Sequence, residues 1–252
     1  MRIDEILYTQ GFGTRRVCAG LVQQGRVAVR GAAVTDPAEE FEPEGLRFIV
    51  QGAEWAYHEK AYLMLHKPAG TECSQKPSAW PSVYTLLPPP LRQRPNKGAV
   101  AGVQAVGRLD QDTTGLLLLT DDGALIHRMS SPKHHVPKVY EVTTKHPVDE
   151  KQISRLLAGV ALDDHPKPVR AAACEIAGSC RLNLTLTEGK YHQVKRMIAA
   201  VGNRVEALHR SRIGALALPE ELPEGHWRWL DAAQVEALGR GPVSQPDAEG
   251  DR

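Results

Sequence analysis

The chain has 252 residues, 42% of them hydrophobic and 24% charged, values typical of an ordinary soluble globular protein with one large domain or two smaller ones. No apolar run approaches the roughly 20 residues that a membrane-spanning helix needs, so no membrane partner is expected. The net charge of +1 excludes a uniformly basic protein, but the charge is unevenly spread. Residues 1–30 hold five arginines against Asp4 and Glu5, and the segment from Pro219 onward holds eight acidic residues against three arginines.

The termini and the cysteines indicate a cellular compartment. The first residues contain no apolar signal-peptide core behind a basic end. The four cysteines have no Cys-x-x-Cys spacing and lie far from any regular pairing of histidines, so reduced thiols are expected rather than disulfides or a zinc site. We therefore expect a cytoplasmic protein, with a monomer as the default oligomeric state.

The first part of the chain predicts a small α/β unit. Ile3, Ile6 and Leu7 favour a short helix that ends near Gly11, and Thr14 is a suitable N-cap for a second helix. The apolar face of that helix is predicted to contain Val17, Cys18, Leu21 and Val22. Strands are expected over 26–30, toward Val34 after a turn at Arg30-Gly31, and over 46–50. A linker is expected over residues 53–60.

Next comes a short strand over 62–66, which a turn at Lys67-Pro68-Ala69-Gly70 ends. Residues 75–104 are rich in Pro, Gly and basic residues, which favours a surface loop without helices.

The central stretch, residues 107–123, places a charged loop directly before four consecutive leucines. Leu116 to Leu119 predict a strand buried on both faces. A loop at the end of such a strand can hold one carboxylate rigidly in a cleft. Taken alone, the Asp110-Gln111-Asp112-Thr113-Thr114 loop is equally compatible with a solvated connection.

The remaining chain predicts alternating helices and strands. Asp121 or Asp122 is expected to cap a helix whose inward residues include Leu125 and Met129. A strand is expected over 138–144, Asp149 and Gln152 resemble a capping box for the next helix, and Leu182, Leu184 and Leu186 alternate with polar residues as a half-buried strand does.

The clearest helix carries Val194, Met197, Ile198 and Val201 on one face. Lys195 and Arg196 lie off that face near the helix start, where the helix dipole favours anions. Their position predicts either a nearby carboxylate or phosphate, or solvated surface charges.

Three separated motifs point to a family. They are Gly107-Arg108-Leu109-Asp110-x-x-Thr113-x-Gly115 with the leucines that follow, Lys138-x-Tyr140-x-Val142, and residues 188–197, Glu-Gly-Lys-Tyr-His-Gln-Val-Lys-Arg-Met. Their order and spacing resemble the pseudouridine synthases, specifically the branch of small ribosomal enzymes typified by RsuA. The likeness runs to about Leu238. Residues 1–52 resemble an S4-type RNA-binding domain, through Arg2-Ile3-Asp4, Thr14-Arg15-Arg16 and residues 24–31.

The resemblance implies an α+β fold. Its catalytic domain, over residues 61–238, is two-lobed on a mainly antiparallel sheet, and a small S4-like α/β RNA-binding domain precedes it. Residues 239–252 match nothing and are expected to be a disordered acidic tail.

The resemblance also implies the site. Asp110 is expected to be the essential aspartate, Tyr140 the aromatic residue against the target base, and Lys195 the basic partner of Asp110. Arg108 is expected to enter the duplex when the uridine is flipped out. RNA contacts are expected from these residues: Arg196, Lys190, His192, Arg15, Arg16 and Arg26.

The reaction implied is the isomerisation of uridine to pseudouridine in small-subunit ribosomal RNA. It involves no redox change or group transfer, so no cofactor and no metal are expected. A single carboxylate can act as nucleophile, or as base in a glycal route. Large-subunit RNA as substrate, and a non-catalytic S4-type RNA-binding protein, remain alternatives.

Two departures and three other interpretations complete the prediction. His66 stands where relatives often carry asparagine, and the Pro-rich segment 88–104 looks longer than in the family. Two interpretations are not favoured: His134, His135 and His192 as metal ligands, and Asp110 with Asp112 as a glycosidase pair. Trp227 and Trp229 are expected to be packing residues.

Overall fold

The computed structural model describes residues 1–96, 101–131 and 134–239. Residues 240–252, which make up nearly all of the predicted tail, lie outside this description. By its contacts the chain divides into two compact units. The first contains Met1–Tyr62, Tyr84–Ala105 and Leu119–Gly123, and the second contains the rest. No helix among the described residues is long and apolar enough to cross a membrane.

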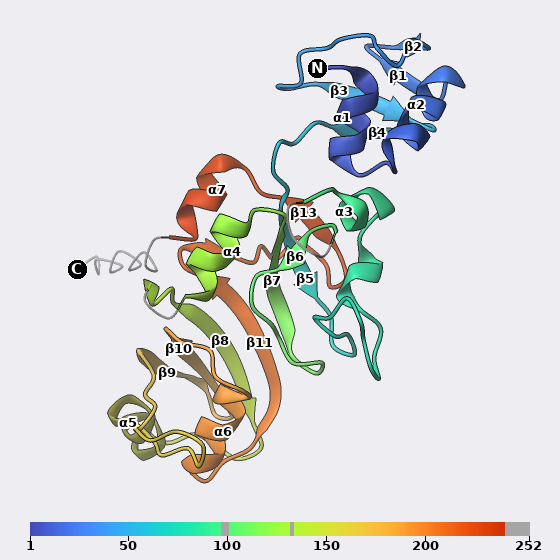
Figure 1. Cartoon of the computed structure of the whole chain (residues 1–252). Coiled ribbons are helices and arrows are strands. Elements are labelled where there is room, and N and C mark those ends of the chain that lie inside the picture. The colour runs from blue at the N-terminus through green and yellow to red at the C-terminus, as the bar shows by residue number, and fades with distance from the viewer. Residues whose placement is uncertain (97–100, 132–133, 240–252) are drawn as a thin grey trace, which may run out of the picture. The chain divides into compact units, whose positions relative to one another are not determined.

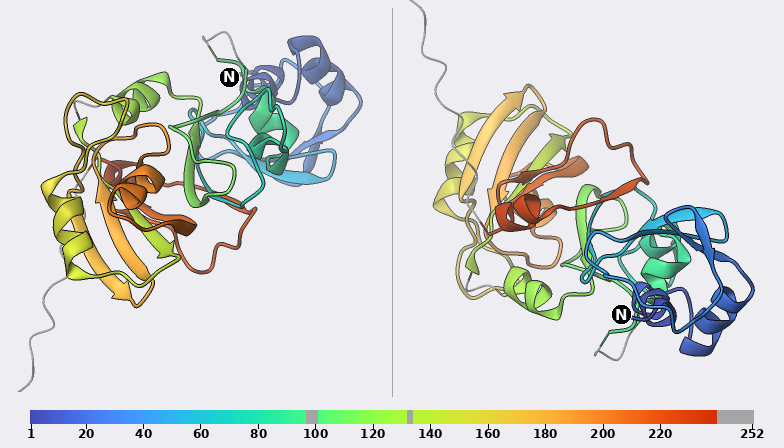
Figure 2. Two further views of the ribbon diagram at one scale, coloured as in Figure 1. Left: turned by 90° about the horizontal axis from the view of Figure 1, so that it is seen from below. Right: turned by 90° about the horizontal axis from the view of Figure 1, so that it is seen from above.

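The first unit begins with two helices packed on a four-stranded sheet, and Figures 1 and 2 show the helices side by side. Helix α1 (Ile3–Gln10) ends at Gly11, whose φ of 88° suits glycine, and Thr14 caps α2 (Arg15–Gln23) by accepting from the Val17 N–H. The sheet order is β2-β1-β3-β4, from strands β1 (Val27–Val29), β2 (Ala32–Val34), β3 (Arg47–Val50) and β4 (Ala53–Ala56). Cys18 and Val22 face the core as predicted, but Val17 is exposed.

Two expectations for residues of the first unit are wrong, and one of them concerns a segment that begins in the second unit. Residues 53–56 are not a linker, because β4 pairs with β3 along its full length. The segment over 75–104 contains a 3₁₀ turn, η1 (Val83–Leu86), a short helix α3 (Pro89–Gln93) and the strand β6 (Gln104–Ala105). Prolines suit the first turn of a helix, since no intrahelical partner is lost there. Residues 75–81 are exposed and form no helix or strand, as expected. From Val83 on, Leu87, Leu91 and Val103 are buried, so this described part of the segment is packed rather than a surface loop.

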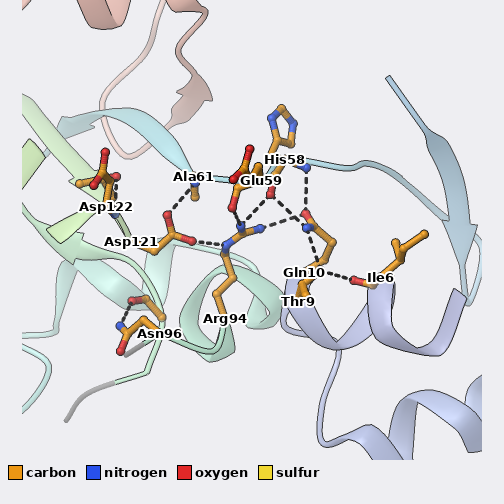
Figure 3. Close-up of polar contacts among 12 residues, drawn as sticks. Ile6, Thr9, Gln10, His58, Glu59, Ala61, Arg94, Asn96, Asp121 and Asp122 are labelled. Atoms are coloured by element: carbon orange, nitrogen blue, oxygen red, sulfur yellow. Dashed lines mark hydrogen bonds and ion pairs between the residues drawn. The ribbon is translucent and has the colours of Figure 1, made fainter. Parts of the chain in front are cut away.

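A buried polar cluster joins these parts of the first unit (Figure 3). The Arg94 guanidinium, at the end of α3, donates to Asp121 Oδ2 at 2.7 Å, to Gln10 Oε1 at 2.9 Å and to the His58 carbonyl at 2.7 Å. Asp121 Oδ1 also accepts from the Ala61 N–H. Asp121 therefore serves as the partner of a buried arginine, a role that the sequence did not suggest.

The second unit is built on a mainly antiparallel sheet with the order β13-β5-β7-β11-β8-β10-β9. Its strands are β5 (Tyr62–Lys67), β7 (Thr114–Thr120), β8 (Lys138–Thr144), β9 (Ala173–Gly178), β10 (Arg181–Leu186), β11 (Val205–Ile213) and β13 (Trp227–Trp229). A further short strand, β12 (Leu216–Ala217), pairs with β11. β7 and β11 form a parallel pair. The last residues of β7 pair with β6.

Helices cover one face of this sheet. α5 (Glu150–Ala158) lies against β9, and α6 (Gln193–Ala200) lies against β11 (Figure 1). Asp149 and Gln152 form the predicted capping box. The core on this face includes Val142, Leu184, Met197 and Ile198. The helices α4 (Gly123–Ser130) and α7 (Ala232–Ala237) complete the elements.

Candidate active site

The second unit contains a cavity of about 810 Å³. Its walls come from the loop before β7, from β8 and β11, and from the start of α6. Polar lining residues include Arg108, Asp110, Thr113, Lys138, Tyr140, Glu188, Lys190, His192, Lys195 and Arg210. The three sequence motifs, far apart in the chain, thus line one cavity, which is where convergent polar groups in a protein usually mark function.

The loop that carries Asp110 is held in place by a buried lysine. Lys67, at the end of β5, has no exposed surface, and its Nζ donates to the carbonyls of Pro68 (3.0 Å), Gln111 (3.3 Å) and Thr113 (2.9 Å). Burial lowers the pKa of Lys67. The Gly70 N–H also donates to the Gln111 carbonyl. From the sequence only a turn was expected at Lys67-Pro68; a lysine that directly follows an apolar strand was the available signal.

Gly115 sets the start of β7. Its φ is +110°, and a Cβ there would lie 2.4 Å from the Arg210 carbonyl oxygen on the neighbouring strand. Only glycine allows β7 and β11 to approach this closely. The approach brings the Asp110 loop and the Arg210 strand to the same cavity.

Asp110 contacts a lysine and a histidine. Lys195 Nζ lies 3.0 Å from Asp110 Oδ2, and His192 Nε2 lies 3.4 Å from Asp110 Oδ1. The same Lys195 Nζ lies 2.6 Å from Asp112 Oδ1. Of the two alternatives for Lys195, a nearby anion or solvation, the structure shows the first, and the anion is a pair of aspartates. The side chains of Asp110 and Lys195 remain 29% and 26% exposed, so the pair is open to a ligand.

The charges of this cluster stabilise one another. Burial opposes the positive charge of Lys195, but its hydrogen bonds with Asp112 and Asp110 outweigh burial and raise the pKa of the ammonium group. Burial likewise opposes the negative charge of Asp112, but the Lys195 hydrogen bond and charge hold the pKa of that carboxyl below its usual value. Lys195 is therefore a cation throughout the neutral pH range.

His192 has a strained backbone. It is the N-cap residue of α6, and its φ of 46° and ψ of 35° lie in the left-handed region, which non-glycine residues enter at a cost. Tyr191 is 75% exposed and stacks on the His192 ring, with ring centroids 3.8 Å apart. This conformation directs the His192 imidazole toward Asp110 while an aromatic ring lies at the surface.

The other predicted residues are distributed as follows. Tyr140 is almost buried and lines the cavity, and Arg108 is exposed at its rim. Lys190 pairs with Glu188 at 2.6 Å, and Arg196 pairs with Asp164 rather than lying free for RNA. Arg15, Arg16 and Arg26 belong to the first unit, where all three are exposed.

Two basic residues that line the cavity, Lys138 and Arg210, were not predicted as site residues from the sequence. Lys138 lies two residues before Tyr140, and Arg210 is the register partner of Tyr140 on β11. Burial, and then the charge of Arg210, lower the pKa of Lys138 to about 8. Lys138 belongs to one of the three motifs, so its presence was visible; nothing local marked Arg210.

The alternative interpretations find no support in the geometry. Asp110 and Asp112 share one lysine, so they do not face each other across a space for a sugar. Within the described part of the chain, no three His, Cys, Asp or Glu side chains are grouped so that they could hold a metal ion. His66 forms a hydrogen bond with the Leu222 carbonyl, and Trp227 and Trp229 contact each other edge to face.

Two family models match the chain. Residues 61–200 match the model described as RNA pseudouridylate synthase, and residues 1–45 match the S4 domain. The site residues described above fall within the first match, with the exception of Arg210 and the arginines of the first unit. The fold and the site thus define an RNA-modifying isomerase.

The relatives are similar over nearly their full length. The chain is 37% identical to ribosomal small subunit pseudouridine synthase A of Haemophilus influenzae, over 94% of this chain and 99% of that protein. It is 38% identical to the protein of the same description from Escherichia coli K12, over 94% and 100%. A crystal structure of a pseudouridylate synthase matches with a TM-score of 0.65 and 36% identity, covering 94% of this chain and 99% of that one. The chain belongs to the RNA pseudouridylate synthase family.

Proposed function

We propose that this protein converts a specific uridine of small-subunit ribosomal RNA to pseudouridine, with Asp110 as the essential carboxylate. The observation that carries the proposal is the pair of Asp110 and Lys195, 3.0 Å apart and partly open in the cavity beside Tyr140. The small-subunit substrate is supported by the descriptions of the relatives from two organisms.

In this proposal the target uridine leaves the RNA stack and enters the cavity. Flipping costs a few kcal/mol, which stacking on Tyr140 and insertion of Arg108 into the vacated space partly offset. The exposed position of Arg108 at the cavity rim supports this role, because a buried arginine could not reach the duplex. Tyr140, as a nearly buried wall residue, would be covered by the incoming base.

The chemistry needs one carboxylate and no cofactor. The N1–C1′ bond breaks, the uracil turns, and C5 bonds to C1′. Asp110 acts either as the nucleophile at C1′ or as the base that removes a proton from the sugar. Lys195 holds Asp110 in place by a charge-assisted hydrogen bond, and Lys67 holds the backbone of the same loop. Both interactions favour preorganisation of the carboxylate.

The S4 match supports a role of the first unit in RNA binding. Arg15 and Arg16 lie in the first turn of α2, which has no acidic residue, and Arg26 is exposed before β1. Lys190 and His192 would contact RNA nearer the cavity. Arg196 would reach the RNA backbone only after leaving Asp164. We further propose that the protein acts on ribosomal RNA in the cytoplasm and that it is a monomer. Mass measurement of the native protein tests its oligomeric state.

The proposed activity is tested with small-subunit RNA labelled with tritium at C5 of uridine, because C5 loses its hydrogen in the product. Wild-type protein is expected to release tritium equal to one uridine per RNA. Asp110→Asn is expected to release none while it still binds the RNA. Asp112→Asn, which removes the same charge from the same lysine, serves as the matched comparison and is expected to retain more activity. Turnover by Asp110→Asn would contradict the mechanism. Activity on large-subunit RNA alone would show that the substrate is large-subunit rather than small-subunit RNA.

A further inference from the structure

Two positively charged side chains lie on an otherwise apolar face of the sheet. Lys138 and Tyr140 are two residues apart on β8, and Arg210 is the register partner of Tyr140 on β11. Residues two apart on a strand, and direct cross-strand partners, point to the same face. Opposite Lys138 and Tyr140 on β10 are Leu186 and Leu184. This is the face that α5 and α6 cover, and at its cavity end it becomes cationic.

Arg210 is buried and Lys138 is partly buried, and neither has the anionic partner that a charge withdrawn from water usually has. Arg210 is 3% exposed; its Nε donates to the Leu116 carbonyl at 2.8 Å, but its Nη2 is buried with no hydrogen-bond partner. Lys138 Nζ donates to the Val136 carbonyl at 2.9 Å. Across residues 1–96, 101–131 and 134–239, neither side chain forms an ion pair with a carboxylate.

A third polar group in the cavity wall is also unsatisfied. Thr113 is 1% exposed, and its Oγ1 has no hydrogen-bond partner among the described residues. It lines the same cavity as Lys138 and Arg210. Buried donors without acceptors are costly, and buried cations without anions cost more. The lowered pKa of Lys138, about 8, reflects this burial and the charge of Arg210. The arrangement is therefore expected to be completed by a ligand with oxygen acceptors that carry negative charge.

The position in the cavity favours a base over a phosphate as that ligand. A flipped nucleotide enters a pocket base first, so its phosphates stay near the rim. Arg210, at 3% exposure, lies too deep for an RNA backbone phosphate, whereas a uracil ring against Tyr140 would lie beside the register partner of that tyrosine. Uracil has two carbonyl oxygens, O2 and O4, and no other strong acceptor when bonded through N1.

We propose that Lys138 and Arg210, with the Thr113 hydroxyl, bind the carbonyl oxygens of the flipped uracil and stabilise the anion that it becomes when the N1–C1′ bond breaks. This inference rests on the proposed function. It assigns the departing base a binding site of its own, distinct from the Asp110 and Lys195 pair that acts on the sugar.

The reaction leaves negative charge on the departing base. When the N1–C1′ bond breaks, its electron pair remains on uracil and spreads over N1, O2 and O4. C1′ either bonds to an Asp110 oxygen, or the sugar loses its C2′ proton to Asp110. Attack of C5 on C1′ then expels the Asp110 oxygen, or is accompanied by return of the C2′ proton. C5 finally loses its proton and N1 gains one, so the product is an isomer of the substrate.

The symmetry of uracil explains how one set of donors serves the whole turn. A half-turn about the line through N3 and C6 exchanges N1 with C5, which the isomerisation requires. The same half-turn exchanges O2 with O4. Donors that hold both oxygens before the turn therefore find an oxygen in each position afterwards. Lys138 and Arg210 need not move between bond cleavage and bond formation.

The test compares Lys138→Met with Lys145→Met, which removes an exposed lysine just after the same strand. RNA binding and the first-turnover rate at saturating protein are measured separately. Wild type must first convert the RNA; if it does not, the proposed function itself fails.

Lys138→Met is expected to lower the rate about 100-fold, as loss of one preorganised donor does. Its RNA Kd is expected to stay within about twofold, since this lysine interacts much more strongly with the uracil anion than with the carbonyl oxygens of the neutral base. Lys145→Met should match wild type, and Lys138→Arg should recover part of the rate.

A second substrate isolates the leaving group. Fluorine at C5 withdraws electrons and stabilises the uracil anion, so RNA with 5-fluorouridine at the target position needs less help from cations. The rate deficit of Lys138→Met, measured as consumption of that nucleotide, is expected to shrink to about tenfold or less. An equal deficit with both substrates, or an unchanged rate with uridine, would overturn the inference. Weaker RNA binding with a flatter salt dependence would also overturn it, because that result marks a phosphate contact.

Discussion

Two aspartates flank the central strand β7, and each binds a cation in a different way. Asp121 follows the strand and pairs with Arg94 at 2.7 Å, and both side chains are nearly buried, at 7% and 2% exposure. Asp110 precedes the strand and pairs with Lys195 at 3.0 Å, with both side chains more than a quarter exposed. The distances are similar, so burial and the number of satisfied atoms distinguish the pairs.

The difference separates a structural contact from a chemical one. Arg94 donates to Asp121, to Gln10 and to two backbone carbonyls, so little of its hydrogen-bonding capacity is left for a ligand (Figure 3). Asp110 shares its lysine with Asp112 and meets His192 only at 3.4 Å. An ion pair that is open on one side can exchange a partner for a substrate, whereas a closed one holds the fold together.

The largest expected effect is on catalysis, at Asp110. Asp110→Asn keeps the shape of the side chain but removes the carboxylate, so the turnover rate is expected to fall at least roughly 10⁴-fold, as loss of a principal catalytic group does. The free energy of unfolding should change by no more than about 0.5 kcal/mol, because the site is partly exposed. Tritium release and denaturant unfolding measure the two quantities. A large loss of stability with only a modest loss of rate would contradict the assignment of the Asp110–Lys195 pair to chemistry rather than to stability.

The converse is expected at Arg94. Arg94→Met leaves Asp121 buried without its cation, which is expected to cost about 3–5 kcal/mol in unfolding free energy. The matched control is Arg92→Met on the same helix, where the arginine is exposed and the expected cost is small. Denaturant unfolding checks both variants. Equal stability of the two would show that the cluster in Figure 3 is dispensable.

Lys195 tests the open pair from its other side. Lys195→Met is expected to lower turnover about 100-fold, because Asp110 loses its charge-assisted hydrogen bond. Lys195→Arg should retain more activity, since it keeps the positive charge. The raised pKa of Lys195 keeps this side chain protonated well above neutral pH. Deprotonation of Lys195 should therefore not lower the rate between pH 7 and 10.5, the ordinary pKa of a lysine. A pH–rate profile of Lys195→Arg that differs from wild type in this range would contradict that assignment.

Lys138 extends the comparison to a cation with no anionic partner in the described part of the chain. Its folded-state pKa of about 8 lies below the ordinary 10.5, so the unfolded chain holds this proton to higher pH than the folded protein does. The cost of the buried charge is therefore fully present below pH 8 and is lost as pH rises toward 10.5. Compared with Lys138→Met, wild type should gain stability over that window. Thermal unfolding at several pH values checks this, and parallel curves for the two proteins would contradict it.

The smallest expected effect concerns the first unit. Replacing Arg15, Arg16 and Arg26 by glutamine should weaken RNA binding and reduce the slope of log affinity against log salt by about 0.7 for each phosphate that is no longer neutralised. Turnover at saturating RNA should not change, because none of these residues lines the cavity. The control replaces three exposed cations elsewhere, Lys151, Lys167 and Arg170. An unchanged slope in the first variant would mean that this unit does not dock on RNA.

Local pattern predicted most elements, and its failures have physical causes. The strand over 138–144, the capping box at Asp149 and the helix with Val194 and Met197 are confirmed, because each depends on neighbours in sequence. Within the loop predicted over 75–104, the part from residue 83 on was predicted wrongly, since the buried Arg94 and Leu91 gain their partners only through distant contacts. Proline content signalled a loop where the prolines begin a helix.

For the candidate site, the sequence identified residues that belong to a motif, but it did not identify residues that reach the cavity only through strand pairing. The contact of Lys195 with Asp110, 85 positions apart, was expected from the resemblance, and the geometry brings the two together. The second carboxylate on Lys195, Asp112, was not expected. Arg210 could not be assigned from sequence, because its place opposite Tyr140 depends on the β8–β11 register and on the close approach at Gly115.

The most direct test of the proposed activity and of the role of Asp110 is a pseudouridine map of ribosomal RNA from cells that lack this gene, alone or carrying either wild type or Asp110→Asn. One small-subunit uridine should stay unmodified without the gene, regain its modification with wild type and remain unmodified with Asp110→Asn. A map in which no position depends on the gene would contradict the proposed activity, and restoration of the modification by Asp110→Asn would contradict the role of Asp110.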